Sequence, residues 1–547
     1  YILSLELTLI RTNKSNIDLY LDGEIVLDIL SIKVKENLLS KAIEKLEADI
    51  NDLAESVKDK IDGDLYWCHT YLPHRDDGIR GTIQHYYLIE IISFLNKNYN
   101  VKKLIITTVL PIWIINQIKL KTNIDISKRI KHNEIITVIK EKIGPLKKYL
   151  KYLKASLLKS NSYDFKNCVL FFYSTDSFIR LKNFPDRIFK RKIFLDVSLT
   201  EVYDYDLKER KTISVFKPKL FLRALFISLK FQYSKRLFLK NYRTGNLFSD
   251  YIYHQSFFQS YFVILRQMTM LDFFKNNTPD LLVTSTNFGD PLRRQITSIL
   301  SRKKVPVLNF ACRPIYSKFR PEDRAISADL KKYNKTSIPD YHVVFDNISK
   351  DHLIDFGVKK ERIFGYKSIT NQKGMYQIRD GMIILFAHYS YNNDIIEILE
   401  SFRENELLFN KIYFREHPLV KIDESQKQRL QKITDNLICF SDKQWSEIEI
   451  INSICFTSNS TSAIDAVGKG AGVIWLPFLT NHSIQFSFVM NMIGKNCNSK
   501  EEFYNFLYKL EKNKKMRTKF IADCQNTHNE KLETEDDSSV LINKLIS

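Results

Sequence analysis

The sequence predicts an α/β protein built from two successive domains. Short runs of β-branched and aromatic residues alternate with amphipathic stretches along most of the 547 residues, a pattern typical of parallel sheets covered by helices. A polar, glycine-containing stretch at 370–381 separates two such series. Hydrophobic residues make up 44% of the chain and charged residues 27%, which is typical of packed domains and excludes a disordered, collagen-like or coiled-coil chain.

The first series supplies six strand candidates, each bounded by turn residues or charged residues. They are 65–72, 102–110, 168–175, 280–287, 305–311 and 341–346. The second series reads MIILFAHYS, KIYFREHP, NLICFSD, SICFTSNS and AGVIWLPF, with helical periodicity between the strands. We therefore expect a first domain over 1–370 and a second over 371–547. The second includes a charged helical segment that starts at Lys500 and could pack on either domain.

Two such series predict two Rossmann-like domains that face each other across a cleft. In open parallel sheets, ligands bind outside the carboxyl ends of the strands, and clefts between domains are frequent ligand sites. The candidate functional residues are therefore sought where the predicted strands end.

Cysteine usage and hydropathy bear on the compartment. The seven cysteines are scattered without the close spacing of a zinc site or a redox motif, so we expect a reducing, cytoplasmic compartment and no structural metal. No stretch approaches the roughly 18 to 20 apolar residues of a membrane-spanning helix, and the first ten residues lack the basic start of a signal peptide. Because the given sequence begins with Tyr1, a leader ahead of it is left open.

Positive charge is concentrated in one region. The chain carries a formal net charge of +20, and residues 140–243 contain 25 Lys or Arg against 9 Asp or Glu, so we interpret this region as a basic insertion. Its end, 217–243, has eight basic residues, no acidic ones and interleaved Leu, Phe, Ile and Tyr. This composition favours the headgroup layer of an anionic membrane, with a solvated basic helix face as the alternative. No nucleic-acid-binding signature accompanies the charge, so we expect no nucleic-acid partner.

Two histidines follow strands of the second series. His417, in FREHP, comes at the carboxyl end of a strand that Pro418 terminates, and His388 ends the first strand of the domain. His417 could donate to a phosphate oxygen or protonate a departing phosphate, since the pKa of histidine lies near neutrality. His388 could contact the base or the phosphate of a nucleotide. A structural histidine is the alternative.

A hydroxyl-rich turn follows a later strand. In SICFTSNSTSAIDAVGKGAGVIWLPF, the hydroxyl residues of this turn precede a helix, whose free N–H groups and dipole favour an anion. Simple N-capping is the alternative. Asp465 could reach ribose hydroxyls, and Gly468, Gly470 and Gly472 allow a tight return to the next strand. The candidate phosphate-binding residues of the turn are Ser458, Ser460, Thr461 and Ser462.

The His-Pro pair and the later Ser/Thr turn, together with 280–311 and 341–366, resemble bacterial surface-carbohydrate biosynthesis proteins of the GT-B glycosyltransferase class. They are more distantly similar to CMP-sugar-dependent sialyltransferases and capsular Kdo transferases. The resemblance spans about residues 280–480. It implies that His417 contacts or protonates the CMP phosphate and that Ser460, Thr461 and Ser462 hold it.

Candidate acceptor-side residues lie in the first domain. Sialyltransferases carry an acidic pair followed by Gly that supplies the base, and the resemblance transfers this role to Asp76 and Asp77, although Asp-Asp-Gly is also a common turn. Arg75 and Arg80 could bind an anionic group or neutralise these aspartates. Three further residues, Asp290, Arg293 and Arg313, could line the acceptor side of the cleft. Surface ion pairing is the alternative for them.

The predicted function is a glycosyltransferase that transfers a sugar from a nucleotide donor, CMP by resemblance, to a lipid-linked or oligosaccharide acceptor in lipopolysaccharide or capsule synthesis. We expect no metal requirement, because donors at the helix terminus and on side chains take its place. We expect no cofactor either, because the nucleotide sugar is a substrate. We expect the protein at the cytoplasmic face of the membrane, bound peripherally through 217–243. The alternatives are a teichoic-acid-type transferase using a CDP-alcohol and a non-catalytic membrane-associated scaffold of the same fold.

Overall fold

The computed structural model of the chain describes a defined set of residues, and all structural statements below concern them. They are 6–13, 16–22, 32–57, 79–99, 101–106, 112–128, 164–173, 188, 190–196, 201–212, 217–240, 247, 249, 253, 257–275, 277–285, 291–310, 338–366, 376–386, 392–404, 411–416, 422–433, 436–443, 445–458, 460, 462–479, 492–533 and 538–546.

The first part of the chain forms a four-stranded sheet with three helices. The strand order is β1-β2-β3-β4, with β1 antiparallel to β2 and the others parallel. The strands are β1 (Glu6–Asn13), β2 (Asn16–Asp22), β3 (Val101–Ile106) and β4 (Asp125–Lys128), and the helices are α1 (Ile32–Val57), α4 (Ile79–Tyr99) and α5 (Ile112–Thr122). The strand predicted at 102–110 is thus present, but it belongs to this separate sheet. The strand predicted at 65–72 lies outside the described residues.

An eight-stranded sheet follows, in the order β12-β11-β10-β9-β5-β6-β7-β8. Its strands are β5 (Cys168–Tyr173), β6 (Arg191–Asp196), β7 (Glu201–Asp204), β8 (Glu209–Thr212), β9 (Leu281–Ser285), β10 (Val307–Phe310), β11 (Tyr341–Val344) and β12 (Ile363–Gly365). All neighbours are parallel except the antiparallel pairs β6–β7 and β7–β8. The central strands are mostly apolar, as expected where helices cover both faces of a parallel sheet.

The region interpreted as a basic insertion contributes to this sheet. Strands β5 and β6 lie within 140–243 and pair near the centre of the sheet. The net charge of a segment reflects mainly its surface residues. Whether its strands lie in the centre of a sheet depends instead on the apolar residues that they bury. The helices of this part are α8 (Pro218–Lys240), α10 (Phe257–Phe273), α11 (Pro291–Arg302) and α13 (Asn347–Asp355), with a 3₁₀ turn at Lys360–Arg362.

The last part of the chain forms a six-stranded parallel sheet in the order β16-β15-β14-β18-β19-β20, beside a parallel pair of β13 (Tyr376–Arg379) and β17 (Ile448–Ile451). Its strands are β14 (Met382–Leu385), β15 (Ile412–Arg415), β16 (Leu437–Cys439), β18 (Ser453–Thr457), β19 (Ala471–Trp475) and β20 (Lys495–Asn496). Counted along the chain, these six strands stand in the order 3-2-1-4-5-6, the doubly wound order of dinucleotide-binding domains. All five strands predicted for the second series are therefore confirmed.

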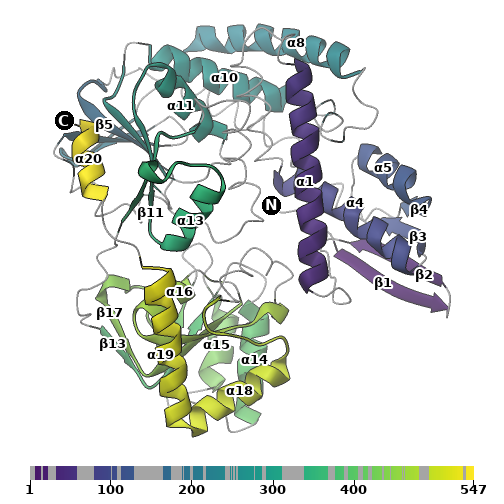
Figure 1. Cartoon of the computed structure of the whole chain (residues 1–547), viewed down its shortest axis with the longest axis vertical. Coiled ribbons are helices and arrows are strands. Elements are labelled where there is room, and N and C mark those ends of the chain that lie inside the picture. Colours follow the sequence, from purple (N-terminus) through teal and green to yellow (C-terminus); the bar gives the residue numbers. More distant parts are fainter. Residues whose placement is uncertain are drawn as a thin grey trace.

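The helices of the last part divide between the two large sheets. They are α14 (Asn392–Glu404), α15 (Glu424–Ile433), α16 (Ser462–Gly468), α18 (Lys500–Lys512), α19 (Lys514–Lys531) and α20 (Ser538–Ile546), with 3₁₀ turns at Trp445–Glu447 and Pro477–Leu479. Helix α19 packs on β19. Helix α20 instead lies beside the eight-stranded sheet (Figure 1), and its Leu541 and Ile542 share a core with Phe310 and Tyr366. The chain therefore returns to the eight-stranded sheet at its end.

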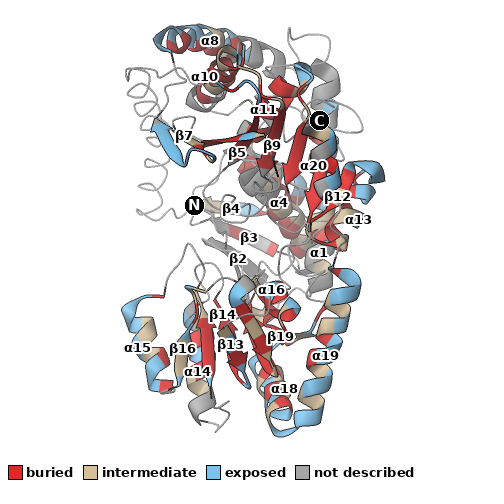
Figure 2. Ribbon diagram, turned by 90° about the vertical axis from the view of Figure 1, so that its left-hand side faces the viewer, coloured by how far each residue is buried: buried red, intermediate tan, exposed pale blue. Residues whose placement is uncertain are grey.

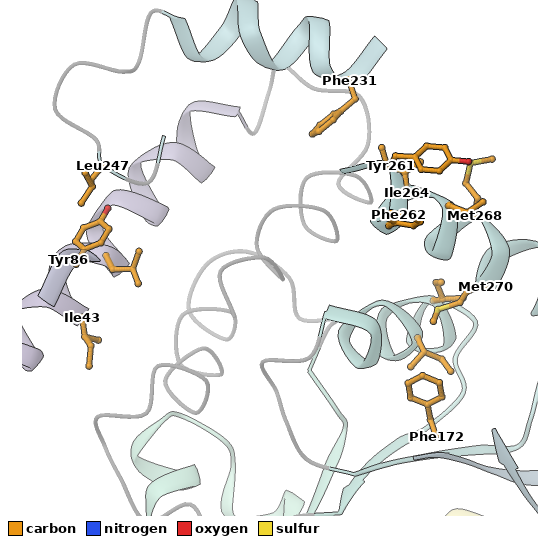
Figure 3. Packing of buried hydrophobic residues seen from close by; sticks show 14 of the residues in the cluster. Ile43, Tyr86, Phe172, Phe231, Leu247, Tyr261, Phe262, Ile264, Met268 and Met270 are labelled. Atoms are coloured by element: carbon orange, nitrogen blue, oxygen red, sulfur yellow. The ribbon is translucent and has the colours of Figure 1, made fainter. Parts of the chain in front are cut away.

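The α/β class is confirmed, with parallel sheets and helices in both large parts of the molecule (Figure 1). Buried residues fill the central strands of each large sheet (Figure 2). One apolar cluster joins helices α1 and α4 to β5 and α10, and Figure 3 shows Ile43 and Tyr86 on one side of it and Phe172 and Met270 on the other. No described helix is long and apolar enough to cross a membrane.

Candidate functional site

The candidate site lies at the carboxyl edge of the six-stranded sheet, where three neighbouring strands end. Leu385 of β14 pairs with Arg415 of β15, and Ile384 of β14 pairs with Phe456 of β18. Because all three strands are parallel, the segments that follow them leave the sheet at one edge. The boundary between β14 and β18 is the point where the strand order reverses, and ligands of doubly wound sheets bind there.

Thr457 connects the two strands on either side of this reversal point through hydrogen bonds. Its hydroxyl is completely buried, donates to the carbonyl oxygen of Leu385 at 2.8 Å, and accepts from the backbone N–H of Ser460 at 3.2 Å. A single side chain thus ties the end of β14 to the turn that follows β18. The backbone of the predicted phosphate-binding turn is held in place by the sheet itself.

The turn after β18 leads directly into a short helix. Ser458 is buried, whereas Ser460 and Ser462 are partly exposed. The carbonyl oxygen of Ser460 accepts from the backbone N–H of Ala463 at 3.1 Å, and α16 begins at Ser462. Hydroxyls of Ser460 and Ser462 are therefore placed where a ligand at the sheet edge could be bound.

Arg415 ends β15 as a fixed cation. Its Nη1 donates to the carbonyl oxygens of Phe440 at 3.2 Å and Lys443 at 2.7 Å, and its guanidinium lies 4.8 Å from the ring centroid of Trp445. Burial lowers the pKa of Arg415, which the carboxylates of Asp465 and then Asp442 oppose. Arginine nevertheless stays charged at neutral pH. The edge thus contains a positive charge that stacking and hydrogen bonds hold in one orientation.

The segment carrying His417 has described ends. The backbone N–H of Glu416 donates to Ser441 Oγ at 2.9 Å, and Glu416 Oε1 accepts from the backbone N–H of Ile422 at 3.1 Å. The side chain of Glu416 therefore bridges residue 416 to residue 422, the two described residues that flank 417–421. The described residues on either side of the His-Pro segment, at the end of β15 and just before α15, are thus held together.

The glycines after α16 have a steric role. Gly470 has φ +112°, and a Cβ there would lie 2.2 Å from the carbonyl oxygen of Ile450. A Cβ on Gly472 would lie 2.9 Å from the ring of Phe520 in α19. The tight return into β19 therefore needs glycine for both conformation and space. This confirms the sequence argument at Gly470, whereas Gly472 lies within β19 and needs glycine for its contact with α19.

Several predicted site residues lie outside the described residues, so their side chains are not placed. They are His417, His388, Asp76, Asp77, Arg75, Thr461, Asp290 and Arg313. For His388 and His417 the attachment points are described, since Phe386 and Glu416 both stand at the edge where β14 and β15 end. Their roles stay predictions.

The remaining predicted residues fall in three places. Asp465 is exposed on α16, at the same edge as Ser460 and within electrostatic reach of Arg415. Arg293 is 7% exposed in the first turn of α11, which follows β9 of the eight-stranded sheet. Arg80 is the second residue of α4, and only its backbone is described. Helix α4 packs on the four-stranded sheet, whereas α11 packs on the eight-stranded sheet. Arg80 and Arg293 therefore belong to helices that pack on different sheets.

Sequence reasoning missed Arg415 and Thr457 as parts of the site. Arg415 stands in the FREHP motif itself, and its place at the strand end was the available signal. Thr457 precedes the serines of the turn, but only the structure reveals that its hydroxyl reaches β14. Within the described part of the chain, no group of three or more His, Cys, Asp and Glu side chains could hold a metal ion.

Comparison with known proteins gives structural similarities only. No family model and no curated protein matches the chain. It is similar to a UDP-GlcNAc 2-epimerase from Neisseria meningitidis bound to UDP-GlcNAc (TM-score 0.40, 10% identity, 70% of this chain and 99% of that chain). It is also similar to a putative UDP-N-acetylglucosamine 2-epimerase from Listeria monocytogenes (0.37, 12%, 67% and 94%). A third similar structure is the kitacinnamycin glycosyltransferase (0.37, 8%, 71% and 100%).

Proposed function

We propose that this protein is a glycosyltransferase that binds a nucleotide sugar at the carboxyl edge of the six-stranded sheet. The observation that carries the proposal is the 3-2-1-4-5-6 strand order, because His388, His417 and the Ser458–Ser462 turn all follow strands that end beside its reversal point. Doubly wound sheets bind nucleotides at this point. The resemblance of the His-Pro and Ser/Thr motifs to GT-B glycosyltransferases supports the same assignment.

The proposed mechanism assigns each group a role. The hydroxyls of Ser460, Thr461 and Ser462 hold the donor phosphate. His417 donates a proton or hydrogen bond to the phosphate as negative charge develops on it, which lowers the barrier to departure. Arg415 positions the β15 edge through its bonds to Phe440 and Lys443.

The acceptor side completes the proposed reaction. Asp76 or Asp77 accepts the proton of the acceptor hydroxyl as the sugar is transferred. The sugar–phosphate bond breaks, the bond from the acceptor oxygen to the sugar forms, and the nucleotide departs with the bonding electron pair. Neither a metal nor a cofactor takes part in this scheme.

The finer proposals concern the donor, the acceptor and the location. We infer a CMP-linked donor from the motif resemblance, and a lipid-linked or oligosaccharide acceptor in lipopolysaccharide or capsule synthesis. The reaction would take place at the cytoplasmic face of an anionic membrane, which the basic composition of 217–243 supports.

A thermal-shift screen of the whole chain against CMP, CDP, UMP, UDP, GDP and ADP tests the proposal. A nucleotide that binds the folded state raises its stability by about 2.7 kcal/mol at one hundred times its dissociation constant. We expect stabilisation by a pyrimidine nucleotide, with CMP as the leading candidate, and a reduced shift in His417→Ala and in Ser460→Ala/Ser462→Ala.

Lys411→Ala is the matched control, because Lys411 is exposed at the opposite end of β15 from His417. It should respond to nucleotide as the unmodified chain does. Absence of a shift with every nucleotide, in protein that unfolds cooperatively, would contradict the proposal. Release of CMP from a CDP-alcohol rather than from a CMP-sugar would replace it with the polyol-phosphate transferase.

A further inference from the structure

Helix α8 has two faces of different surroundings. Leu220, Phe221, Ala224, Ser228 and Phe231 are buried on the side where α10 packs. Tyr261 of α10 donates through its hydroxyl to the carbonyl oxygen of Phe221 at 3.3 Å. Figure 3 shows Phe231 on the side of α8 where Tyr261 and Met268 lie. This face anchors the helix to the protein.

The opposite face of α8 is apolar and exposed. Leu222 is 64% exposed, Phe226 70%, Leu229 52% and Tyr233 68%. These residues are four, three and four positions apart, the spacing that aligns side chains along one side of a helix. Single exposed apolar residues are ordinary, but a continuous row of large ones marks an interaction surface.

A basic row runs beside the apolar row. Lys219, Arg223 and Lys230 are exposed and follow the same helical spacing, and Arg236 is exposed near the end of the helix. The helix contains no acidic residue. Lys217, just before it, is neutralised by Asp272 with Nζ and Oδ2 2.5 Å apart, so the uncompensated charge lies on the outward face.

The position of α8 leaves this face accessible. In both Figure 1 and Figure 2 the helix lies along one end of the molecule, outside α10, with the six-stranded sheet at the other end. Residues along α8 are largely exposed in Figure 2. A flat surface can therefore approach the helix along its length.

We propose that the outward face of α8 is the surface by which the protein binds an anionic lipid bilayer, with the helix lying in the interface. Leu222, Phe226, Leu229 and Tyr233 enter the boundary between headgroups and acyl chains, while Lys219, Arg223 and Lys230 contact anionic headgroups. An apolar row flanked by basic residues fits this partner, because apolar burial and attraction to anionic lipid act together. This inference deepens the proposed function and rests on it for the lipid-linked acceptor.

Vesicle sedimentation of the whole chain tests the inference. We expect binding to phosphatidylcholine vesicles that contain phosphatidylglycerol and little binding to pure phosphatidylcholine. Each basic residue near the surface contributes about 1 kcal/mol, so Lys219→Gln/Arg223→Gln/Lys230→Gln should lower the partition coefficient roughly a hundredfold. Phe226→Gln/Leu229→Gln, which leaves the charge unchanged, should also abolish most binding.

The matched control is Lys514→Gln/Lys515→Gln/Lys519→Gln, which removes the same charge from exposed positions of α19. It should bind anionic vesicles as the unmodified chain does. An equal loss in this control, or no binding of the unmodified chain, would overturn the proposal. So would a Phe226-dependent dimer or a Phe226-dependent complex with RNA that forms instead of vesicle binding.

The thermal shift caused by nucleotide distinguishes a failure of the membrane-binding inference from a failure of the proposed enzymatic function. Both α8 variants should keep the thermal shift of the unmodified chain, since α8 and the six-stranded sheet are separate parts of the fold. Loss of vesicle binding with retained nucleotide binding supports the α8 assignment. Vesicle binding by a chain that no nucleotide stabilises would sustain the lipid surface and contradict only the glycosyltransferase.

Discussion

Thr457 illustrates how one buried hydroxyl can organise the candidate site. It serves as donor to Leu385 and acceptor from Ser460, and therefore joins two strands whose ends are distant in the sequence. A valine has nearly the same shape but neither hydrogen-bonding capacity. Replacing Thr457 with valine would leave the carbonyl oxygen of Leu385 and the N–H of Ser460 without this partner.

We expect Thr457→Val to lower the free energy of unfolding by about 1–3 kcal/mol and to weaken nucleotide binding. Thr269→Val is the control, because the buried hydroxyl of Thr269 has no hydrogen-bond partner among the described residues. That change should be neutral or stabilising. Urea denaturation of both variants measures the difference, and equal effects would contradict the role given to Thr457.

Asp346 is a second residue whose chemistry is set by its surroundings. It caps α13, accepting from Ser349 N at 2.6 Å and from Ser349 Oγ at 2.8 Å. Burial raises its pKa to about 6, although the bonds from Ser349 act in the opposite direction. Between pH values of about 4 and 6, the folded state therefore keeps a proton that the unfolded state has lost.

Asp346 should consequently make the protein less stable as the pH rises through this window, by up to about 3 kcal/mol. Asp346→Asn keeps a capping oxygen and removes the ionisation, so we expect it to stabilise the protein at pH 7.5 and to have little effect at pH 4. Asp355→Asn, at an exposed position of the same helix, serves as control. Urea denaturation at both pH values checks the sign. A variant whose advantage does not grow with pH would contradict the assignment.

At the scale of elements, the return from α16 to β19 depends on Gly470. Helix α16 ends at Gly468 and β19 begins at Ala471, so the chain must turn from the helix into the strand within two residues. At Gly470 the positive φ and the carbonyl oxygen of Ile450 together exclude a side chain. The turn from α16 into β19 therefore requires glycine at this position.

We expect Gly470→Ala to lower the free energy of unfolding by more than about 3 kcal/mol, since strain from the positive φ and a steric clash act together. Gly357→Ala is a matched change, with φ +97° after α13, and should cost about 1–2 kcal/mol from the backbone alone. Thermal and urea denaturation compare them. Equal losses would show that the contact with Ile450 is unimportant.

At the scale of the whole molecule, the chain passes between the two large sheets twice. It leaves the eight-stranded sheet after β12 and returns with α20, whose Leu541 and Ile542 are 1% and 0% exposed in the core around Phe310. The last helix thus stabilises a part of the protein that was completed some 170 positions earlier in the sequence, from β12 at Ile363–Gly365 to α20 at Ser538–Ile546.

Leu541→Ala and Ile542→Ala should each lower the free energy of unfolding by about 2–5 kcal/mol, because each leaves a cavity in this core. Val540→Ala, in the same helix but 68% exposed, should change it by less than about 0.5 kcal/mol. Denaturation of the three variants measures these differences. A comparable loss for Val540→Ala would show that α20 acts through helix formation rather than through the core.

The sequence by itself determined the class of fold and the strands of the second series. These follow from local information, since strand periodicity, Pro418 and the glycines act within a few residues. For example, SICFTSNS gave both the strand β18 and the turn after it.

Only the tertiary structure decided which strands are neighbours. The separate sheet that contains β3, the central place of β5, the return of α20 and the bond from Thr457 to Leu385 all join residues distant in the sequence. Periodicity indicates that a face will be buried, but the partner that covers it depends on packing among many apolar surfaces of similar character. The outward face of α8 also required the structure. The basic and apolar composition of 217–243 is evident in the sequence, but which of its residues stay exposed depends on which face α10 covers.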